Sequence, residues 1–223
     1  MENQPTPRRP LEERRARGRP ARADHVDPDV LLRHARQVFA VRGFDATSVR
    51  EIARSAGVDP ALMAHYFGSK EELWIAVVDQ IAIEIAPLID RFLDLRHSEY
   101  SSGERVEQAL MAFIDAMFRS WDAGIFFSTA AAASGERLTI LVERLAKPFH
   151  DAMMPLLTDA IRAGEIHRND PETLYFMICH AISQTISFSH VVRPFSSLPE
   201  RPEAFKHSVL KTALSMLGLS AGK

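Results

Sequence analysis

At 223 residues with a formal net charge of −2, the chain is long enough for one medium-sized domain or for a small head on a larger body. Its hydrophobic fraction of 46% supports a packed core, and its charged fraction of 25% is ordinary for a globular protein. The single cysteine, Cys179, excludes an intramolecular disulfide. No apolar run reaches the ~20 residues of a membrane span, and no apolar segment follows the basic N-terminus as in a signal peptide. We therefore expect a cytoplasmic protein.

The charge is distributed unevenly along the chain. Residues 1–70 carry 13 Lys and Arg against 9 Asp and Glu, and the remaining residues carry 14 against 20. A basic head on an acidic body favours contact with phosphate at one end only.

The first segment, residues 1–24, holds seven arginines and four prolines and few apolar residues, so we expect a disordered arginine-rich arm. Beyond it, apolar residues recur mostly at helical spacing, interrupted by Gly and Pro, and predict an all-α fold. Pro148 and Pro155 are expected to kink one long helix. The nine expected helices cover about residues 28–42, 48–56, 60–67, 70 to beyond a bend or break at Pro87, 104–120, 123–133, 136–164, 171–192 and 202–217.

The most informative segment is FDATSVREIARSAGVDPALMAHYFGSKEEL, residues 44–73. It opens with an S-x-x-E capping box at Ser48, in which a hydroxyl and a carboxylate bind the free amides of a helix start. Gly57 gives the backbone freedom for a sharp turn, Asp59 caps the next helix, and Pro60 occupies its first position. Two short helices joined by such a turn predict a helix-turn-helix.

The elements RGF, TSVREIA, AGV and YFGSKEEL occur in this order, at the expected spacing and without a gap, in residues 42–73. Together they resemble the DNA-binding signature of the TetR/AcrR family over about residues 28–80. The resemblance implies a DNA-binding head followed by a variable helical body that dimerises and senses a ligand. The expected division is the arm at 1–24, a helix-turn-helix DNA-binding domain at 25–73, and a helical ligand-sensing and dimerisation domain at 74–223.

The resemblance also implies a set of DNA contacts. The Thr47 and Ser48 hydroxyls match positions that anchor a phosphate at a helix N-terminus, and Arg50 matches a position that reaches a base edge. Alternatively, the hydroxyls only cap the helix and Arg50 is a solvated surface residue. The residues concerned are Thr47, Ser48, Arg50, Asp59, Pro60, Ala61, Leu62, Ala64, His65, Tyr66 and Lys70.

The recognition helix has an unusual composition for a DNA reader. Its first turn, residues 60–62, is apolar, which favours contact with thymine methyls over polar readout. Tyr66 and Lys70 match positions that hold the phosphate backbone, although Tyr66 could instead pack inside the head. Ala64 stands where the family usually has a tyrosine, and we expect His65 to take over part of that contact.

The arm contains a second DNA-binding candidate. Arg17-Gly18-Arg19-Pro20 resembles minor-groove hooks, in which Arg17 and Arg19 would lie along the narrow groove. The alternative is a solubilising tail.

Two apolar stripes on the last two helices suggest a homodimer. A single helix-turn-helix binds weakly, and doubling it across a palindromic operator is the usual remedy. Such stripes belong either to a core or to an interface, and the family precedent of a four-helix interface favours the second. The interface candidates are Leu174, Ile178, Ile182, Phe205, Val209, Ala213, Leu214 and Leu217.

The middle helices are rich in phenylalanine and methionine, which line adaptable apolar pockets or fill cores. No histidine or cysteine set has metal-ligand spacing, and Cys179 lies among apolar residues where a thiol is usually inert, so no metal site, cofactor or redox switch is expected. The pocket candidates are Phe118, Trp121, Phe126, Phe127, His150, Met153, Met154, His180 and Gln184.

These observations favour a ligand-responsive, sequence-specific transcriptional repressor that a small apolar ligand releases from DNA. The alternative is an architectural or assembly protein that binds DNA and whose body dimerises without sensing. The sequence contains no nucleophile elbow, glycine-rich phosphate loop or HExxH motif, which argues against an enzyme.

Overall fold

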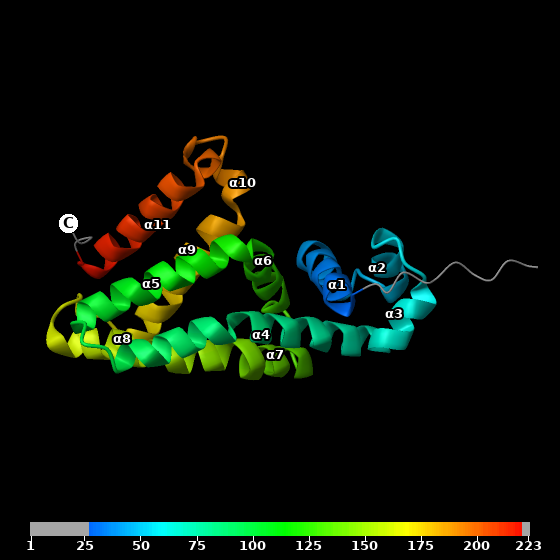
Figure 1. Ribbon diagram of the computed structural model, residues 1–223, viewed down its shortest axis with the longest axis horizontal. Helices are drawn as coiled ribbons and strands as arrows, with labels where there is room; N and C mark the ends of the chain where they lie inside the picture. Colours follow the sequence, from blue (N-terminus) through cyan, green and yellow to red (C-terminus); the bar gives the residue numbers. More distant parts are fainter. Residues whose placement is uncertain (1–26, 220–223) are drawn as a thin grey trace, which may run out of the picture.

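The computed structural model describes residues 27–219, in which every regular element is helical. Figure 1 shows a small head, formed by α1 to α3, at one end of a larger bundle. The expected all-α fold with a helix-turn-helix head is confirmed. The helices are α1 Pro28–Arg42, α2 Val49–Ser55, α3 Pro60–Phe67, α4 Lys70–Arg96, α5 Ser102–Arg119, α6 Trp121–Ala130, α7 Glu136–Leu141, α8 Lys147–Ala163, α9 Pro171–Ser187, α10 Ser189–Val192 and α11 Pro202–Leu217.

Short polar side chains set the boundaries of the head helices. Asp27 and Asp59 cap α1 and α3, and each is followed by a proline, whose missing N–H costs nothing at this position. Complete capping boxes begin at Ser48 for α2 and at Ser69 for α4. Gly57 adopts a φ of 71° in the turn between α2 and α3, which a residue with a Cβ rarely does. The local sequence therefore specifies the helix-turn-helix.

The long helix α4 connects the head to the body (Figure 1). It continues through Pro87, so the break expected there is absent. Pro87 and Ile83, whose carbonyl would receive the missing hydrogen bond, are both exposed, and water can hydrate that carbonyl. The continuous helix gives the head and body a shared rigid element.

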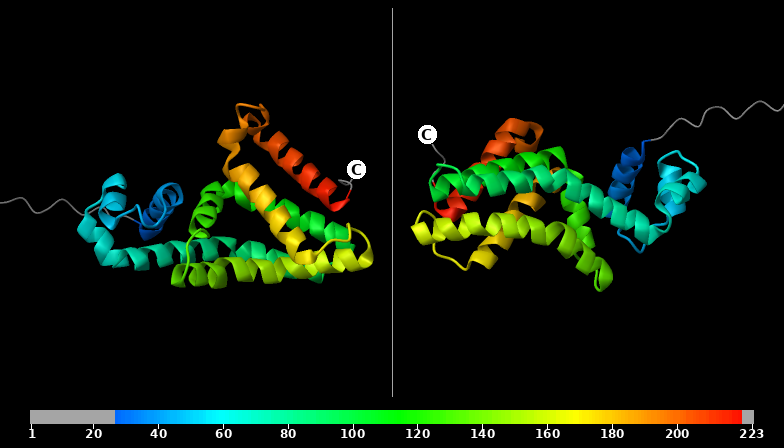
Figure 2. Two further views of the ribbon diagram at one scale, coloured as in Figure 1. Left: turned by 180° about the vertical axis from the view of Figure 1, so that it is seen from behind. Right: turned by 60° about the horizontal axis from the view of Figure 1, so that its bottom comes forward.

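The expected kink near Pro148 takes the form of a π-helical segment. Residues Val142–Ala146 form this wider turn between α7 and α8, immediately before Pro148. A proline ring clashes with the carbonyl four residues earlier in a regular α-helix, and the wider turn relieves that clash. Figure 2 shows the helical ribbon curving along α7 and α8.

Two apolar cores are present in the described residues. The body core lies among α4, α5, α8, α9 and α11. The head core contains the buried face of α1 together with Ile52 and Met63, but it also includes Phe126, Leu141 and Leu145 of the body helices. A domain boundary at residue 73 would fall within α4 and would divide this core, so the head is packed against the body rather than joined by a linker.

Helix ends differ from expectation mainly in the body. The expected helix 171–192 is two elements, because α9 ends at Ser187 and the short α10 follows. The helix expected at 123–133 starts earlier, at Trp121, and ends at Ala130. None of the described helices is long and apolar enough to cross a membrane.

Candidate DNA-binding surface and ligand cavity

The helix-turn-helix exposes most of the side chains expected to contact DNA. Met63 is buried and anchors α3 in the head core, which turns the opposite side of α3 outward. Arg50 is exposed on α2, so its guanidinium is available for a base or a phosphate. Exposed predicted contacts are Ser48, Arg50, Asp59, Pro60, Ala61, Ala64, His65 and Tyr66, and Leu62 is partly buried.

Several of these residues also have a structural task. The Ser48 Oγ accepts a hydrogen bond from the Glu51 amide at 3.3 Å, and the Glu51 carboxylate accepts one from the Ser48 amide at 2.9 Å. The hydrogen bonds from Ser48 lower the pKa of Glu51. The Asp59 carboxylate accepts from the Ala61 amide at 2.8 Å. The alternative of capping therefore applies to Ser48 and Asp59, and their contacts with DNA remain a prediction.

Two expected phosphate contacts are placed differently. Thr47 is only 4% exposed, and its hydroxyl donates to the Gly43 carbonyl at 2.7 Å, so the side chain faces the head rather than the solvent. The Lys70 ammonium donates to the Phe44 carbonyl at 3.0 Å and lies 4.1 Å from the centre of the Phe44 ring. The predicted contacts Arg17 and Arg19 lie outside the described residues.

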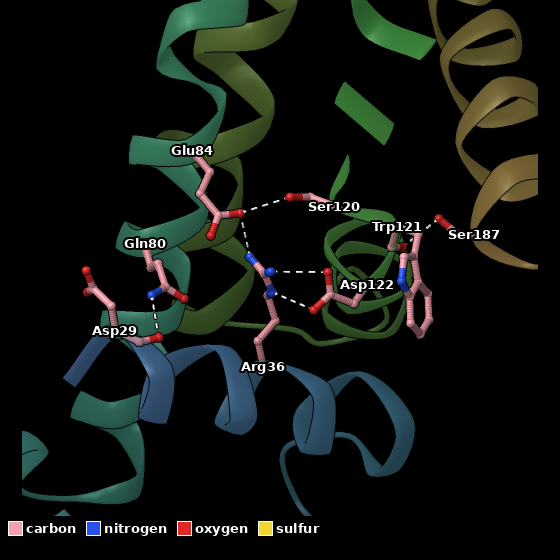
Figure 3. A network of polar contacts seen from close by, with 8 residues as sticks. All are labelled: Asp29, Arg36, Gln80, Glu84, Ser120, Trp121, Asp122 and Ser187. Carbon is pink, nitrogen blue, oxygen red and sulfur yellow. Dashed lines mark hydrogen bonds and ion pairs between the residues drawn. The ribbon is translucent and has the colours of Figure 1, made fainter. Parts of the chain in front are cut away.

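A buried ionic junction joins the head to the body (Figure 3). Arg36 of α1 is 3% exposed and binds Asp122 of α6 with two hydrogen bonds, from Nε at 2.9 Å and from Nη2 at 3.1 Å. Its Nη1 donates to Glu84 of α4 at 2.7 Å, and Ser120 Oγ donates to the same carboxylate oxygen at 3.2 Å. One guanidinium thus links three helices.

The helical position of Arg36 in the sequence could have predicted that this residue takes part in a buried ion pair. Arg36 lies four residues after Leu32 and four before Ala40, so helical spacing alone places it on the buried face of α1. A charged residue at such a position requires a partner of opposite charge, because an unpaired buried charge is costly. The identity of that partner, 86 residues away in Asp122, depends on the tertiary fold.

Further contacts hold the C-terminal end of α1 against the body. Thr129 of α6 donates to the Ala40 carbonyl at 2.9 Å. Arg137 of α7 lies 4.0 Å from the centre of the Phe44 ring and 3.5 Å from an Asp45 oxygen. A displacement of α6 or α7 would therefore be transmitted to the head.

The body contains an apolar cavity of about 160 Å³. Helices α4, α5, α6, α8 and α9 and the π-helical segment all contribute to its wall. The apolar lining residues are Ile81, Ile85, Leu88, Phe113, Ala116, Met117, Ala123, Gly124, Phe127, Leu145, Ala146, Phe149 and Phe176, and the polar or ionisable ones are Ser120, Tyr175, Cys179, His180, Ser183 and Gln184. Such a wall suits a small, mostly apolar molecule.

Three of the nine expected pocket residues line this cavity, namely Phe127, His180 and Gln184. Phe118 instead packs against Phe205 of α11, with ring centres 5.7 Å apart, and Trp121 is half-exposed. These aromatic side chains thus lie in different parts of the molecule, because successive side chains of a helix point in different directions.

The remaining expected pocket residues serve other contacts. Phe126 packs against Trp74 in the head core, and Met153 and Met154 belong to the body core or pack against it. His150 bridges Asp151 at 2.9 Å and Glu172 at 2.8 Å. Burial lowers the pKa of His150, but these hydrogen bonds outweigh burial, and the pKa is raised.

Sequence reasoning missed most of the cavity wall. Ile81, Ile85 and Leu88 lie on one side of α4 at helical spacing, and Phe149 and Tyr175 face each other across α8 and α9 with ring centres 6.3 Å apart. Helical spacing identifies these side chains as buried, but it does not distinguish a cavity wall from a filled core.

The eight residues expected at a dimer interface are all buried inside the single chain. They form the contact of α9 and α11 with the body core. The surface between these two helices is a groove whose lining includes five of the expected residues, and its residues are Ile178, Ala181, Ile182 and Thr185 of α9 and Phe205, Ser208, Val209, Thr212, Ala213 and Met216 of α11. Within one chain the apolar stripes therefore contribute to the core, and their part in a dimer interface stays a prediction.

Residues 31–77 match the family model described as "Bacterial regulatory proteins, tetR family". This segment contains the helix-turn-helix and the start of α4. The DNA-binding head of the chain therefore belongs to the TetR/AcrR family.

Sequence similarity to transcriptional regulators extends beyond the head. The HTH-type transcriptional regulator RutR of Escherichia coli K12 is 25% identical over 84% of this chain and 87% of its own length. The HTH-type transcriptional repressor KstR2 of Mycobacterium tuberculosis is 36% identical over 39% of this chain and 42% of its own.

Solved structures share the fold of this regulator. The match to a tetR-family regulatory protein from Rhodococcus RHA1 covers 86% of this chain and 98% of that protein's chain, with a TM-score of 0.66 and 19% identity. The match to FadR from Bacillus subtilis, solved in complex with stearoyl-CoA, covers 85% of this chain and 99% of the FadR chain, with a TM-score of 0.61 and 20% identity.

Proposed function

We propose that this TetR-family regulator is a homodimeric repressor that binds a palindromic operator and leaves it when a small, mostly apolar molecule occupies the body cavity. The observation that carries the proposal is the continuity between cavity and head. Ser120 lines the cavity and donates to Glu84, and the same Glu84 oxygen accepts from Arg36 of α1.

The DNA-binding end of the proposal rests on α2 and α3. Arg50 is the exposed guanidinium best placed to read a base, and a bidentate contact with guanine contributes about 1–3 kcal/mol of discrimination. The exposed, apolar first turn of α3 suits thymine methyls, and the exposed His65 adds a donor beside it.

The proposed dimer interface is formed by the outer faces of α9 and α11. The apolar stripes of these helices are buried within each protomer. Ala181, Thr185, Ser208 and Thr212 are small, so two copies can bring these helices into close contact. A two-fold axis at this surface would place one head on each side of it, as a palindromic operator requires.

The switch is proposed to act through α6. A ligand moves an equilibrium only if it binds one state more tightly than the other. The cavity wall includes Ala123, Gly124 and Phe127 of α6, and the opposite side of α6 holds α1 through Asp122 and Thr129. A ligand that displaces α6 therefore changes the position of the head, and with it the spacing of two heads on DNA.

The test starts with selection of bound sequences from a random DNA pool, followed by fluorescence anisotropy on the selected site. We expect a palindromic site, two protomers per site, and at least about a fivefold loss of affinity in Arg50→Ala. Arg91→Ala, which removes an exposed arginine of α4 in the body, is the matched control and should bind normally.

The alternative, an architectural protein without sensing, makes different predictions. It would bind all sequences weakly, with affinity that falls steeply with salt and is insensitive to Arg50→Ala. The cavity and its connection to Arg36 favour the sensing regulator.

A further inference from the structure

The charges around the cavity are asymmetric. None of its lining residues is Asp, Glu, Lys or Arg. Ser120, however, donates to the carboxylate of Glu84, and the guanidinium of Arg36 is shared between Glu84 and Asp122 (Figure 3). These three groups sum to one negative charge, so the Ser120 end of the cavity lies in a negative field.

The ionisable groups of the wall do not offset this field. Burial raises the pKa of the Cys179 thiol to about 12 and raises the pKa of the Tyr175 hydroxyl, so both are neutral near pH 7. His180 is the remaining ionisable lining residue, and it is exposed and stacked on Phe176 with ring centres 6.1 Å apart.

The Ser120 hydroxyl at this end of the cavity can accept a hydrogen bond from a ligand but cannot donate one. The Ser120 hydroxyl donates its proton to Glu84, so its oxygen is left as an acceptor toward the cavity. A ligand group placed there must donate a hydrogen bond. A carboxylate would present an acceptor to an acceptor and would also be repelled by the negative charge.

The rest of the wall sets the size and shape of the ligand. An apolar cavity of about 150 Å³ holds one benzene ring, and this cavity is of similar volume at about 160 Å³. Phe113, Phe127, Phe149 and Tyr175 contribute aromatic rings to its wall. The faces of such rings attract cations and pack well against another ring.

We infer that the cavity takes a compact apolar amine, about one ring in size, whose ammonium or amino group donates to Ser120 and is stabilised by Glu84. This inference rests on the proposed role of the cavity as the effector site. It also supplies a cause for release, because an ammonium beside Glu84 competes with Arg36 for that carboxylate. Arg36 then keeps Asp122 but loses its connection to α4.

The inference is tested with four probes that share one ring and differ in the head group: 2-phenylethylamine, 2-phenylethanol, phenylacetate and ethylbenzene. Binding to the full chain at pH 7 is measured by calorimetry, and release from the selected DNA site by anisotropy. We expect the amine to bind most tightly and phenylacetate at least about tenfold more weakly.

Matched variants locate the source of the preference. Glu84→Gln retains the size of the side chain and one acceptor oxygen, removes the charge, and leaves Arg36 paired with Asp122. It should abolish the preference for the amine over the alcohol. Asp90→Asn, which removes an exposed carboxylate on the same helix, should leave the preference unchanged. A thermal melt of each variant verifies that it is folded.

The outcomes separate the inference from the proposed function. Phenylacetate or ethylbenzene binding as tightly as the amine would overturn the amine inference and leave the cavity as an effector site. An amine preference that survives in Glu84→Gln would also overturn it. Failure of all four probes to bind, with the operator still bound specifically, would overturn both the inference and the sensing role.

Discussion

Replacing Arg36 by glutamine tests the ionic junction between head and body. The substitution removes three charge-assisted hydrogen bonds and leaves the Asp122 carboxylate, whose side chain is 9% exposed, without its guanidinium. Removal of one partner from a buried pair usually costs about 3–5 kcal/mol, because the other charge stays buried. We expect a loss of this size in the free energy of unfolding.

The loss is measured by urea denaturation, monitored through the fluorescence of the two tryptophans. Arg33→Gln is the matched control, since Arg33 is exposed on the same helix, and it should change the free energy of unfolding by less than about 0.5 kcal/mol. The same variants are then compared in DNA binding, where a displaced head should weaken Arg36→Gln at temperatures at which it is still folded.

A double variant tests whether the ion pair of Arg36 and Asp122 is shielded from water. Replacement of a buried ion pair by apolar residues is often neutral or stabilising, so Arg36→Met combined with Asp122→Leu should recover most of the loss seen in Arg36→Met alone. A loss below about 1 kcal/mol in Arg36→Gln, or a double variant equal to the sum of its singles, would refute the reasoning.

Three further predictions concern the body. Because hydrogen bonds to two carboxylates raise the pKa of His150 in the folded state, its stabilisation is complete below the unfolded pKa and is lost as pH rises through the folded value. The deficit of His150→Gln in urea denaturation should therefore be larger at pH 5.5 than at pH 8.5, and that of the exposed His97→Gln should not change in this way. Gly124→Ala places a Cβ in steric conflict with the Ser187 oxygen and should cost about 1–3 kcal/mol in thermal denaturation, partly recovered by adding Ser187→Ala. Ala181→Arg should give a folded monomer in analytical ultracentrifugation, and an unchanged dimer would exclude the α9–α11 groove as the interface.

The local sequence determined much of the head. Its helix boundaries follow from signals that act over a few positions, such as the capping residues Ser48 and Asp59, the turn at Gly57 and the spacing of apolar residues. Such signals can be recognised without the tertiary structure. The same local rules gave the helical body and most of its boundaries. They failed at Pro87, where solvent exposure lets a helix continue through a proline.

Only the tertiary structure decided what the apolar residues of the body do. The stripes on α9 and α11 have the periodicity of an interface but lie inside the chain, and the residues that line the cavity come from helices far apart in sequence. Arg36 was recognisable as a charge on a buried face, yet its partners Glu84 and Asp122 are brought to it by the packing of α4 and α6. Periodicity reports that a side chain is removed from water. It does not identify the surface that covers the side chain, because that surface belongs to segments far away in the sequence, and a local pattern carries no information about them.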